Sequence, residues 1–162
     1  MTRGRGTLDD SRSGVGPPAA GQRRRLLLAG LPKPVARARA FTRQALADWS
    51  WLTPEDGADP DVVDDVMLLV AELVANAMMH GGGPLELLLD ATGERLRIEV
   101  SDGEAALPEP QLPHRPGLPG GHGLLIVQRT ADRWGADRHA RGKAVWAEVE
   151  ARRLAPGLAA DR

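Results

Sequence analysis

Two short stretches of alternating apolar and polar residues constrain the fold of this chain more than any other feature. Residues 85–89 read LELLL, in which Leu88 breaks the polar face, and residues 96–101 read LRIEVS, with the polar turn TGE at 92–94 between them. Alternation with a period of two on both sides of a short turn predicts an antiparallel pair of strands with one apolar face. That face must be covered by a second layer, so the chain is predicted to form a layered domain.

Three segments with helical spacing can form that layer. The clearest is 60–80, because Asp59 suits an N-cap, Pro60 suits the first helical position and glycines follow His80. The order of elements predicts an α/β (α+β) two-layer sandwich: a mixed, mostly antiparallel sheet of four or five strands with about three helices on one face. Helices are expected at 35–49, 60–80 and 121–131, and the remaining strands at 25–31, 132–136 and 143–151.

Composition separates a folded domain from two flexible ends. The 162 residues suit a single domain, which is predicted to span 25–151. Residues 1–24 are rich in arginine, glycine, serine and proline and almost lack apolar side chains, so they are predicted to be a disordered basic tail. Their dispersed charges favour a solvated extension over an arm that binds nucleic acid or an acidic partner. Residues 152–162 are predicted to be a flexible C-terminus.

Composition also argues against several classes of protein. Without cysteine there is no disulfide, no thiolate zinc site and no cysteine nucleophile. A net charge of −1 argues against nucleic-acid binding, and no apolar run approaches the roughly 20 residues of a membrane span. No apolar segment follows the first arginines as it would in a signal peptide, so a cytoplasmic protein without membrane contact is expected.

A polar line on the predicted helix 60–80 is the first candidate for chemistry. Glu72, Asn76 and His80 recur every four residues, at the edge of the apolar stripe of this helix. A glutamate there can act as a general base toward a hydroxyl, and an asparagine oxygen is a hard ligand that suits Mg²⁺. Taken alone, this spacing more often belongs to a helix whose polar residues hydrogen-bond to their neighbours.

The dipeptide Asp102-Gly103 is the second candidate, and it directly follows the strand predicted at 96–101. A carboxylate at the mouth of a sheet can accept a hydrogen bond from an exocyclic amine such as that of adenine. Taken alone, Asp-Gly is simply a turn.

The third candidate is the sequence GGHGLL at 120–125. Glycines directly before a helix let backbone N–H groups approach an anion, which the helix dipole also favours. A flexible hinge explains the glycines equally well. No Lys-Ser/Thr follows, so this is not a Walker A loop, and proline-rich residues rather than a strand precede it, so it is not a dinucleotide fingerprint.

In this order, the motifs resemble the histidine-kinase-like (GHKL) ATPase superfamily, and more closely the small bacterial anti-sigma-factor serine kinases. The resemblance covers roughly residues 24–151. It rests on ELVANAMMHGGG at 72–83, RIEVSDG at 97–103, GGHGLLIV at 120–127 and the closing ADRWG and GKAVWAEV segments. It implies a Bergerat-type ATP-binding fold with ATP and Mg²⁺ as cofactors.

The resemblance also implies a role for each residue of the motifs. Glu72 would be the general base, and Asn76 would hold Mg²⁺ between the phosphates. Asp102 would bind the adenine amine, with Gly103 allowing close approach, and residues 104–120 would form a lid. His80 is expected to be structural. The residues implied to contact the phosphates are Gly121, His122, Gly123 and Leu124.

Two positions depart from the family pattern. Relatives usually carry a second glycine two residues after the first, whereas here Glu104 follows Gly103 and the second glycine is missing. Ala144 stands where many relatives have a threonine near the adenine.

The function implied by the resemblance is an ATP-Mg²⁺-dependent serine/threonine kinase that acts on an anti-sigma-factor antagonist, with a sigma factor as a second partner. The alternative is a non-catalytic ATP-binding module that sequesters a partner such as a sigma factor. A homodimer is also conceivable, and Phe41, Trp49 and Trp51 are expected to form an exposed surface for it.

Overall fold

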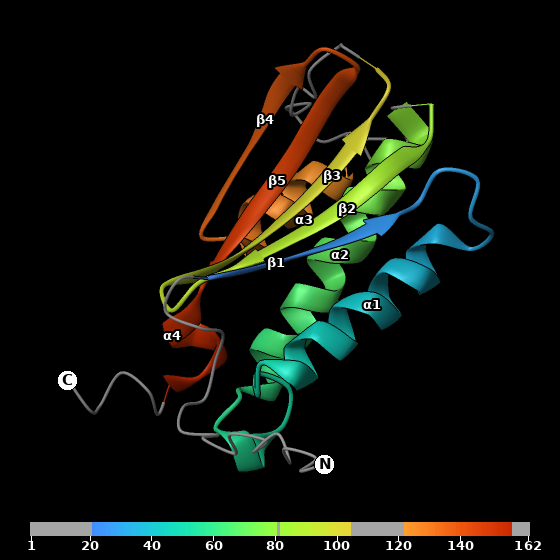
Figure 1. Ribbon diagram of the computed structural model, residues 1–162. Helices are drawn as coiled ribbons and strands as arrows, with labels where there is room; N and C mark the ends of the chain where they lie inside the picture. Colours follow the sequence, from blue (N-terminus) through green and yellow to red (C-terminus); the bar gives the residue numbers. More distant parts are fainter. Residues whose placement is uncertain (1–20, 81, 105–121, 157–162) are drawn as a thin grey trace, which may run out of the picture.

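The fold is a two-layer sandwich, seen in a computed structural model that describes residues 21–80, 82–104 and 122–156 (Figure 1). One layer is a five-stranded sheet with the strand order β1-β2-β3-β5-β4. Each neighbouring pair is antiparallel, so the predicted sandwich is confirmed and its sheet is antiparallel rather than mixed. The strands are β1 (Gln22–Leu27), β2 (Pro84–Ala91), β3 (Arg95–Asp102), β4 (Arg133–His139) and β5 (Gly142–Glu150).

The second layer consists of helices on one face of the sheet (Figure 1). The N-terminus of the longest helix is capped as predicted, because the Asp61 N–H donates to Asp59 Oδ1 at 3.0 Å. None of the helices in the described residues is long and apolar enough to cross a membrane. The helical elements are α1 (Pro34–Asp48), the 3-10 turn η1 (Pro54–Asp56), α2 (Pro60–His80), α3 (His122–Thr130) and α4 (Ala151–Leu154).

The core lies between the sheet and α2. Buried and half-buried residues alternate along β3, as the period-two pattern predicts, and its buried residues pair in register with those of β5. Helix α2 lays an apolar stripe against this face. The innermost side chains, all almost completely shielded from solvent, are Val66, Leu69, Val70, Leu73, Leu96, Ile98, Val100, Val145, Ala147 and Val149.

The first strand differs from its prediction at both ends. It begins at Gln22, inside the segment predicted as tail, and ends at Leu27 rather than at residue 31. Beyond Leu27 the chain turns away, because the N–H groups of Leu28 and Ala29 both donate to the Leu85 carbonyl at 2.9 and 3.2 Å. The rest of the predicted tail, residues 1–20, lies outside the described residues.

The C-terminal prediction also needs correction. Residues 152–154 belong to α4, and Leu154 and Ala155 are buried in the core rather than flexible. The Leu154 carbonyl accepts a hydrogen bond from the Asp59 N–H at 3.0 Å, which ties this end of the chain to the start of α2. Residues 157–162 lie outside the described residues.

The surface predicted for a homodimer is not exposed. Trp49 and Trp51 retain only 3% and 1% of their accessible surface, and their rings pack edge to face with centroids 6.0 Å apart. Trp49 Nε1 donates to Gln22 Oε1 of β1 at 2.5 Å, and Phe41 packs partly buried against the core. The expectation of an exposed aromatic surface was therefore wrong, because these rings anchor α1 to the sheet.

Candidate functional site

Three of the sequence motifs converge on one end of the molecule. Figure 1 shows that β3 ends, β5 begins and α2 ends at this same end. Asp102 is the last residue of β3, and Asn76 lies in the last turns of α2. Residue 122, at the start of α3, belongs to the third motif, and α3 packs against α2.

A buried ion pair lies at the end of β3. Asp102 is 0% exposed, and Lys143, its register partner on β5, is 1% exposed. Lys143 Nζ donates to Asp102 Oδ1 at 3.0 Å, and the Glu104 N–H donates to the same oxygen at 2.9 Å. The other oxygen, Asp102 Oδ2, is buried and has no hydrogen-bond partner among the described residues. One side of this carboxylate is thus satisfied by the protein, and the other lacks a donor.

Lys143 was missed by the sequence analysis, which pointed to its neighbour Ala144. The signal was present, because Lys143, Val145, Ala147 and Val149 alternate on one face of the strand. A lysine at the head of an inward-facing apolar series is a buried cation that needs a partner. Ala144 pairs with Ser101 and lies on the opposite face from Asp102. The residue beside Asp102 is therefore Lys143.

The three residues of the polar line of α2 differ in burial. Asn76 is 8% exposed, and its Nδ2 atom has no partner among the described residues. Glu72, one turn earlier, is half-buried, and none of the hydrogen bonds or ion pairs found in the described part of the chain involves its side chain. His80 is exposed at the end of the helix. Glu72 and Asn76 thus place a carboxylate and an amide on one seam.

Two of the buried polar atoms that lack a partner lie at this end of the molecule. Among the described residues the atoms without a partner are Trp51 Nε1, Asn76 Nδ2 and Asp102 Oδ2, and two of these three belong to residues singled out from the sequence. Leaving a buried polar atom unpaired costs about 1–3 kcal/mol, so such atoms call for a bound group or water. Asn76 and Asp102 therefore have the character of ligand-binding residues.

A glycine that the sequence analysis did not single out brings β5 close to Asp102. Gly142 has φ +146°, and a Cβ at this position would lie 2.1 Å from the Asp102 carbonyl oxygen and 2.7 Å from the Gly103 carbonyl carbon. The corresponding Cβ on Gly103 itself would meet nothing closer than the Arg141 oxygen at 4.0 Å. Close approach of backbone in this region thus depends on Gly142.

The start of α3 is described only in part. Helix α3 begins at His122, as the glycines predicted, whereas Gly121 and residues 105–120, which include most of the predicted lid, lie outside the described residues. The Leu124 side chain is buried, so a contact of this residue with a phosphate would use its backbone N–H. The first four N–H groups of a helix lack intrahelical partners, which leaves them free for such a contact.

Comparison with known families settles the class of this chain. The family model for the histidine kinase-like ATPase domain matches residues 30–149. No curated protein matched the sequence. The chain belongs to the histidine kinase-like ATPase domain family. Membership of this family implies that it binds ATP, and the matched range contains every residue singled out from the sequence motifs.

The geometry of the site fits this histidine kinase-like ATPase domain. Adenine carries an exocyclic amine, and Asp102 Oδ2 is a buried acceptor that lacks a donor. Asn76 supplies a buried amide one turn from a carboxylate, and the first turn of α3 supplies backbone N–H groups suited to phosphates. The chemistry of these residue types thus suits the adenine amine and the phosphates of ATP.

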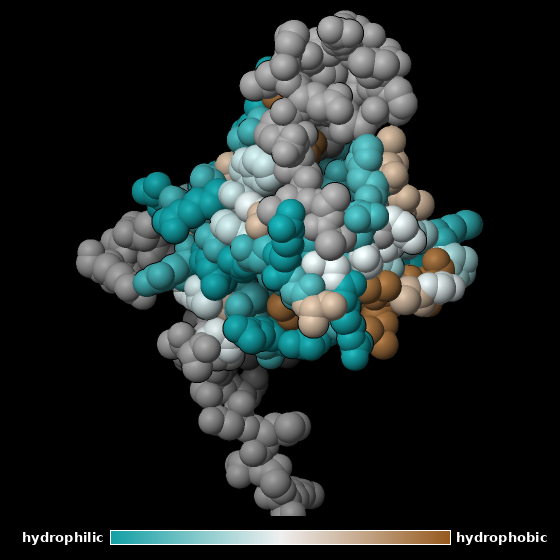
Figure 2. Space-filling model, turned by 90° about the horizontal axis from the view of Figure 1, so that it is seen from above, coloured by the Kyte–Doolittle hydropathy of each residue, from teal (hydrophilic) through white to brown (hydrophobic). Residues whose placement is uncertain are grey.

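Figure 2 looks down on this end of the ATPase domain and shows apolar surface gathered on one side of a largely hydrophilic face. Two methionines of the last turn of α2, Met78 and Met79, are 47% and 57% exposed. A pocket of about 460 Å³ lies beside them, lined in part by Met78 and Leu31. Clustered exposed apolar side chains are typical of protein contact surfaces.

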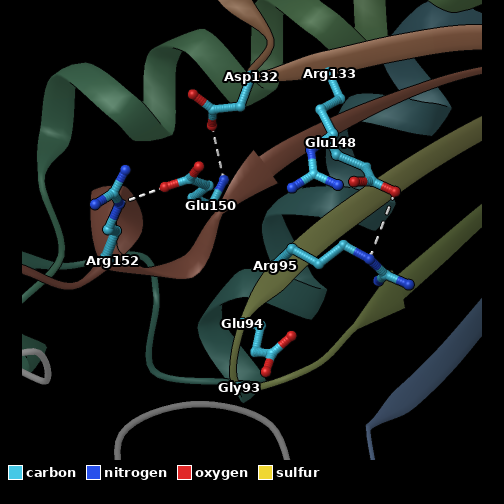
Figure 3. A pocket seen from close by; sticks show the side chains of 8 residues that line it. All are labelled: Gly93, Glu94, Arg95, Asp132, Arg133, Glu148, Glu150 and Arg152. Carbon is cyan, nitrogen blue, oxygen red and sulfur yellow. Dashed lines mark hydrogen bonds and ion pairs between the residues drawn. The ribbon is translucent and has the colours of Figure 1, made fainter.

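A second pocket, at the opposite end of the sheet, contains none of the residues that the resemblance assigns to ATP or Mg²⁺ (Figure 3). It has a volume of about 470 Å³ and is lined by charged side chains of both signs. These charges pair with one another: Arg95 lies 3.6 Å from Glu148, and Arg152 pairs with Glu150. The pocket is therefore a surface depression bordered by ion pairs.

Proposed function

We propose that this ATPase domain transfers the terminal phosphoryl group of ATP to a serine or threonine hydroxyl on a small regulatory protein. The observation that carries the proposal is the seam of α2, where the half-buried Glu72 lies one turn from Asn76, a buried residue whose amide nitrogen has no partner among the described residues. A carboxylate beside a metal ligand is the arrangement that a general base for a hydroxyl needs.

Each motif has a defined task in this proposal. Asp102 accepts a hydrogen bond from the adenine amine through Oδ2, and Gly103 borders the base. The backbone N–H groups of Gly121, His122, Gly123 and Leu124 hold the phosphates, and Glu72 accepts the proton of the attacking hydroxyl. Positioning and electrostatics do most of the work in phosphoryl transfer, so these tasks suffice.

Mg²⁺ would be held by the Asn76 side-chain oxygen together with the phosphates. When bound, it neutralises charge on the transferring phosphoryl group. In the described part of the chain, no group of three histidine or acidic side chains could hold a metal ion. The metal would therefore arrive with the nucleotide, since Mg²⁺ typically takes one or two protein oxygens plus phosphates and waters.

The partner in this proposal is an anti-sigma-factor antagonist-like protein, with a sigma factor as a second partner. Its support is the resemblance to anti-sigma-factor serine kinases and the exposed methionines Met78 and Met79 at the end of α2. A protein substrate has to dock near the end of α2 to bring its hydroxyl to Glu72.

The test is transfer of label from γ-³²P-ATP to candidate antagonist proteins. The Glu72→Ala variant should transfer label about 10²- to 10⁴-fold more slowly than the wild type, because the hydroxyl loses its base. Glu94→Ala, which removes an exposed carboxylate at the far end of the sheet, is the matched control and should leave the rate unchanged. Equal rates for wild type and Glu72→Ala would refute the catalytic role.

Thermal unfolding separates the kinase from a non-catalytic module. At a hundredfold excess over Kd, ATP-Mg²⁺ should raise Tm by about 5–10 °C. If Tm rises but no antagonist receives label, the chain is an ATP-binding module that acts by sequestering a partner. If millimolar ATP leaves Tm unchanged, nucleotide binding itself is refuted.

A further inference from the structure

Lys143 is a buried cation to which the proposed function assigns no task. Its side chain is almost fully enclosed at the start of β5, directly beside Asp102. Burying an ammonium group is costly, and a well-packed apolar pair in the same place is often as stable or more stable. Stability alone therefore does not explain why this position carries a buried ion pair.

The ammonium group is only partly satisfied by the protein. A lysine has three N–H donors. Two of them are used, toward Asp102 Oδ1 at 3.0 Å and toward the Glu104 carbonyl at 3.2 Å. The hydrogen bonds of the described residues include no partner for the third donor, and Asp102 Oδ2 lacks a donor as well. The pair thus keeps one spare donor and one spare acceptor next to each other.

We propose that Lys143 is a second base-recognition residue, which donates a hydrogen bond to ring nitrogen N1 of adenine while Asp102 Oδ2 accepts one from the 6-amino group. The proposal rests on the adenine contact of the proposed function and extends it. The Watson–Crick edge of adenine carries a donor and an acceptor side by side, which complements the spare acceptor and donor of the pair. Hydrogen bonds from a charged donor are stronger than those between neutral groups.

The same pair disfavours purines with a 6-oxo group. In hypoxanthine or guanine placed the same way, O6 would face the carboxylate and N1–H would face the ammonium. Each contact would then join two acceptors or two donors. Binding sites built for a specific hydrogen bond reject analogues that cannot make it far more strongly than apolar pockets do. Lys143 therefore contributes selectivity as well as affinity.

The decisive probe is 1-deaza-ATP, in which a C–H group replaces N1. Titration calorimetry with Mg²⁺ should show that the wild type binds it about 10- to 100-fold more weakly than ATP. The Lys143→Met variant should bind the two nucleotides equally, because the donor that senses N1 is gone. Arg133→Met loses the same charge from an exposed residue of β4 at the far end of the sheet, and should keep the wild-type ratio.

A purely structural role for Lys143 predicts a different result. If Lys143 only neutralised Asp102, Lys143→Met would weaken ATP and 1-deaza-ATP by the same factor. The comparison with 1-deaza-ATP in the wild type does not depend on any variant folding. Asp102→Asn/Lys143→Met, which removes both buried charges, provides a further folded background in which the N1 effect should be absent.

Failure of the inference can be distinguished from failure of the proposed function. Purine riboside triphosphate lacks the 6-amino group and tests the Asp102 contact alone. If loss of the amine weakens binding but loss of N1 does not, the role of Lys143 is refuted while the adenine site stands. If ATP itself does not bind at millimolar concentration, both are refuted.

Discussion

The two ends of the sheet treat charge in opposite ways. At one end, Asp102 and Lys143 form an ion pair that is almost fully buried and leaves an oxygen unpaired. At the other end, exposed side chains such as Arg152 pair across an open pocket (Figure 3). The exposed end has more charges, yet Asn76, Asp102 and the start of α3 lie at the buried end. The candidate site is thus recognised by buried polar atoms that lack a hydrogen-bond partner. The number of charged side chains does not identify it.

The largest expected effect comes from breaking the buried pair. Asp102→Ala should lower the free energy of unfolding by about 3–5 kcal/mol, because it leaves the Lys143 ammonium buried without its counter-ion. Arg152→Ala, at the exposed end, should cost at most about 1 kcal/mol, since surface pairs are screened by water. Urea denaturation followed by circular dichroism measures both values.

The double variant Asp102→Ala/Lys143→Met is the control for this comparison. It removes the stranded cation and should recover a large part of the stability lost in Asp102→Ala. A loss below about 1 kcal/mol in Asp102→Ala would contradict the difference between the two ends.

An intermediate effect is expected from the glycines at the two ends. Gly142→Ala should destabilise the protein by about 2–3 kcal/mol, because its Cβ would collide with the Asp102 carbonyl from a left-handed backbone. Gly93→Ala, in the turn at the exposed end, meets no atom within 4 Å and should be neutral or stabilising by up to about 1 kcal/mol. Equal Tm values for the two variants would contradict this prediction, because they would show that the backbone near Asp102 shifts at little cost to make room for the Cβ.

The smallest effect concerns an exposed ion pair of good geometry. The hydrogen bond from Arg24, followed by that from Gln44, lowers the pKa of Asp48 below its ordinary value of 3.8. The stabilisation that follows is complete above pH 3.8 and is lost as the pH falls through the lower folded-state pKa. Titration of the carboxyl carbon by NMR should show that Arg24→Met raises this pKa, whereas Arg43→Met, on the exposed face of α1, leaves it unchanged. A pKa insensitive to Arg24 would refute the assignment.

The sequence predicted the fold well because its signals are periodic and local. The alternation at 85–101 placed β2 and β3, and Asp59, Pro60 and the glycines after His80 fixed both ends of α2. These signals act within a few residues of one another, so they can be recognised without knowing the tertiary structure. The order of the motifs then sufficed to indicate the family that the chain matches.

Features that depend on contacts between distant segments were predicted less well. Trp49 and Trp51 follow a helix in a segment without periodicity, so nothing local indicated that they pack against β1 and each other. The burial of Leu154 depends on its place beside the start of α2, 95 residues earlier, where its carbonyl meets the Asp59 N–H. Lys143 could not be matched with Asp102 without the register of β5 against β3, because a shift of one residue turns the side chain to the other face of the sheet.

The pairing of Asp102 with Lys143 also has a consequence for how the protein is made. The two residues are 41 positions apart, and β3 meets β5 only after α3 and β4 have been synthesised. At about 5–20 residues per second, roughly 2–8 s separate the synthesis of the two residues on the ribosome. During this interval the nascent chain already contains α2 and the β2–β3 hairpin but lacks the cation that Asp102 pairs with. A nascent chain therefore completes this ion pair, and with it the proposed adenine contact, only when β5 emerges.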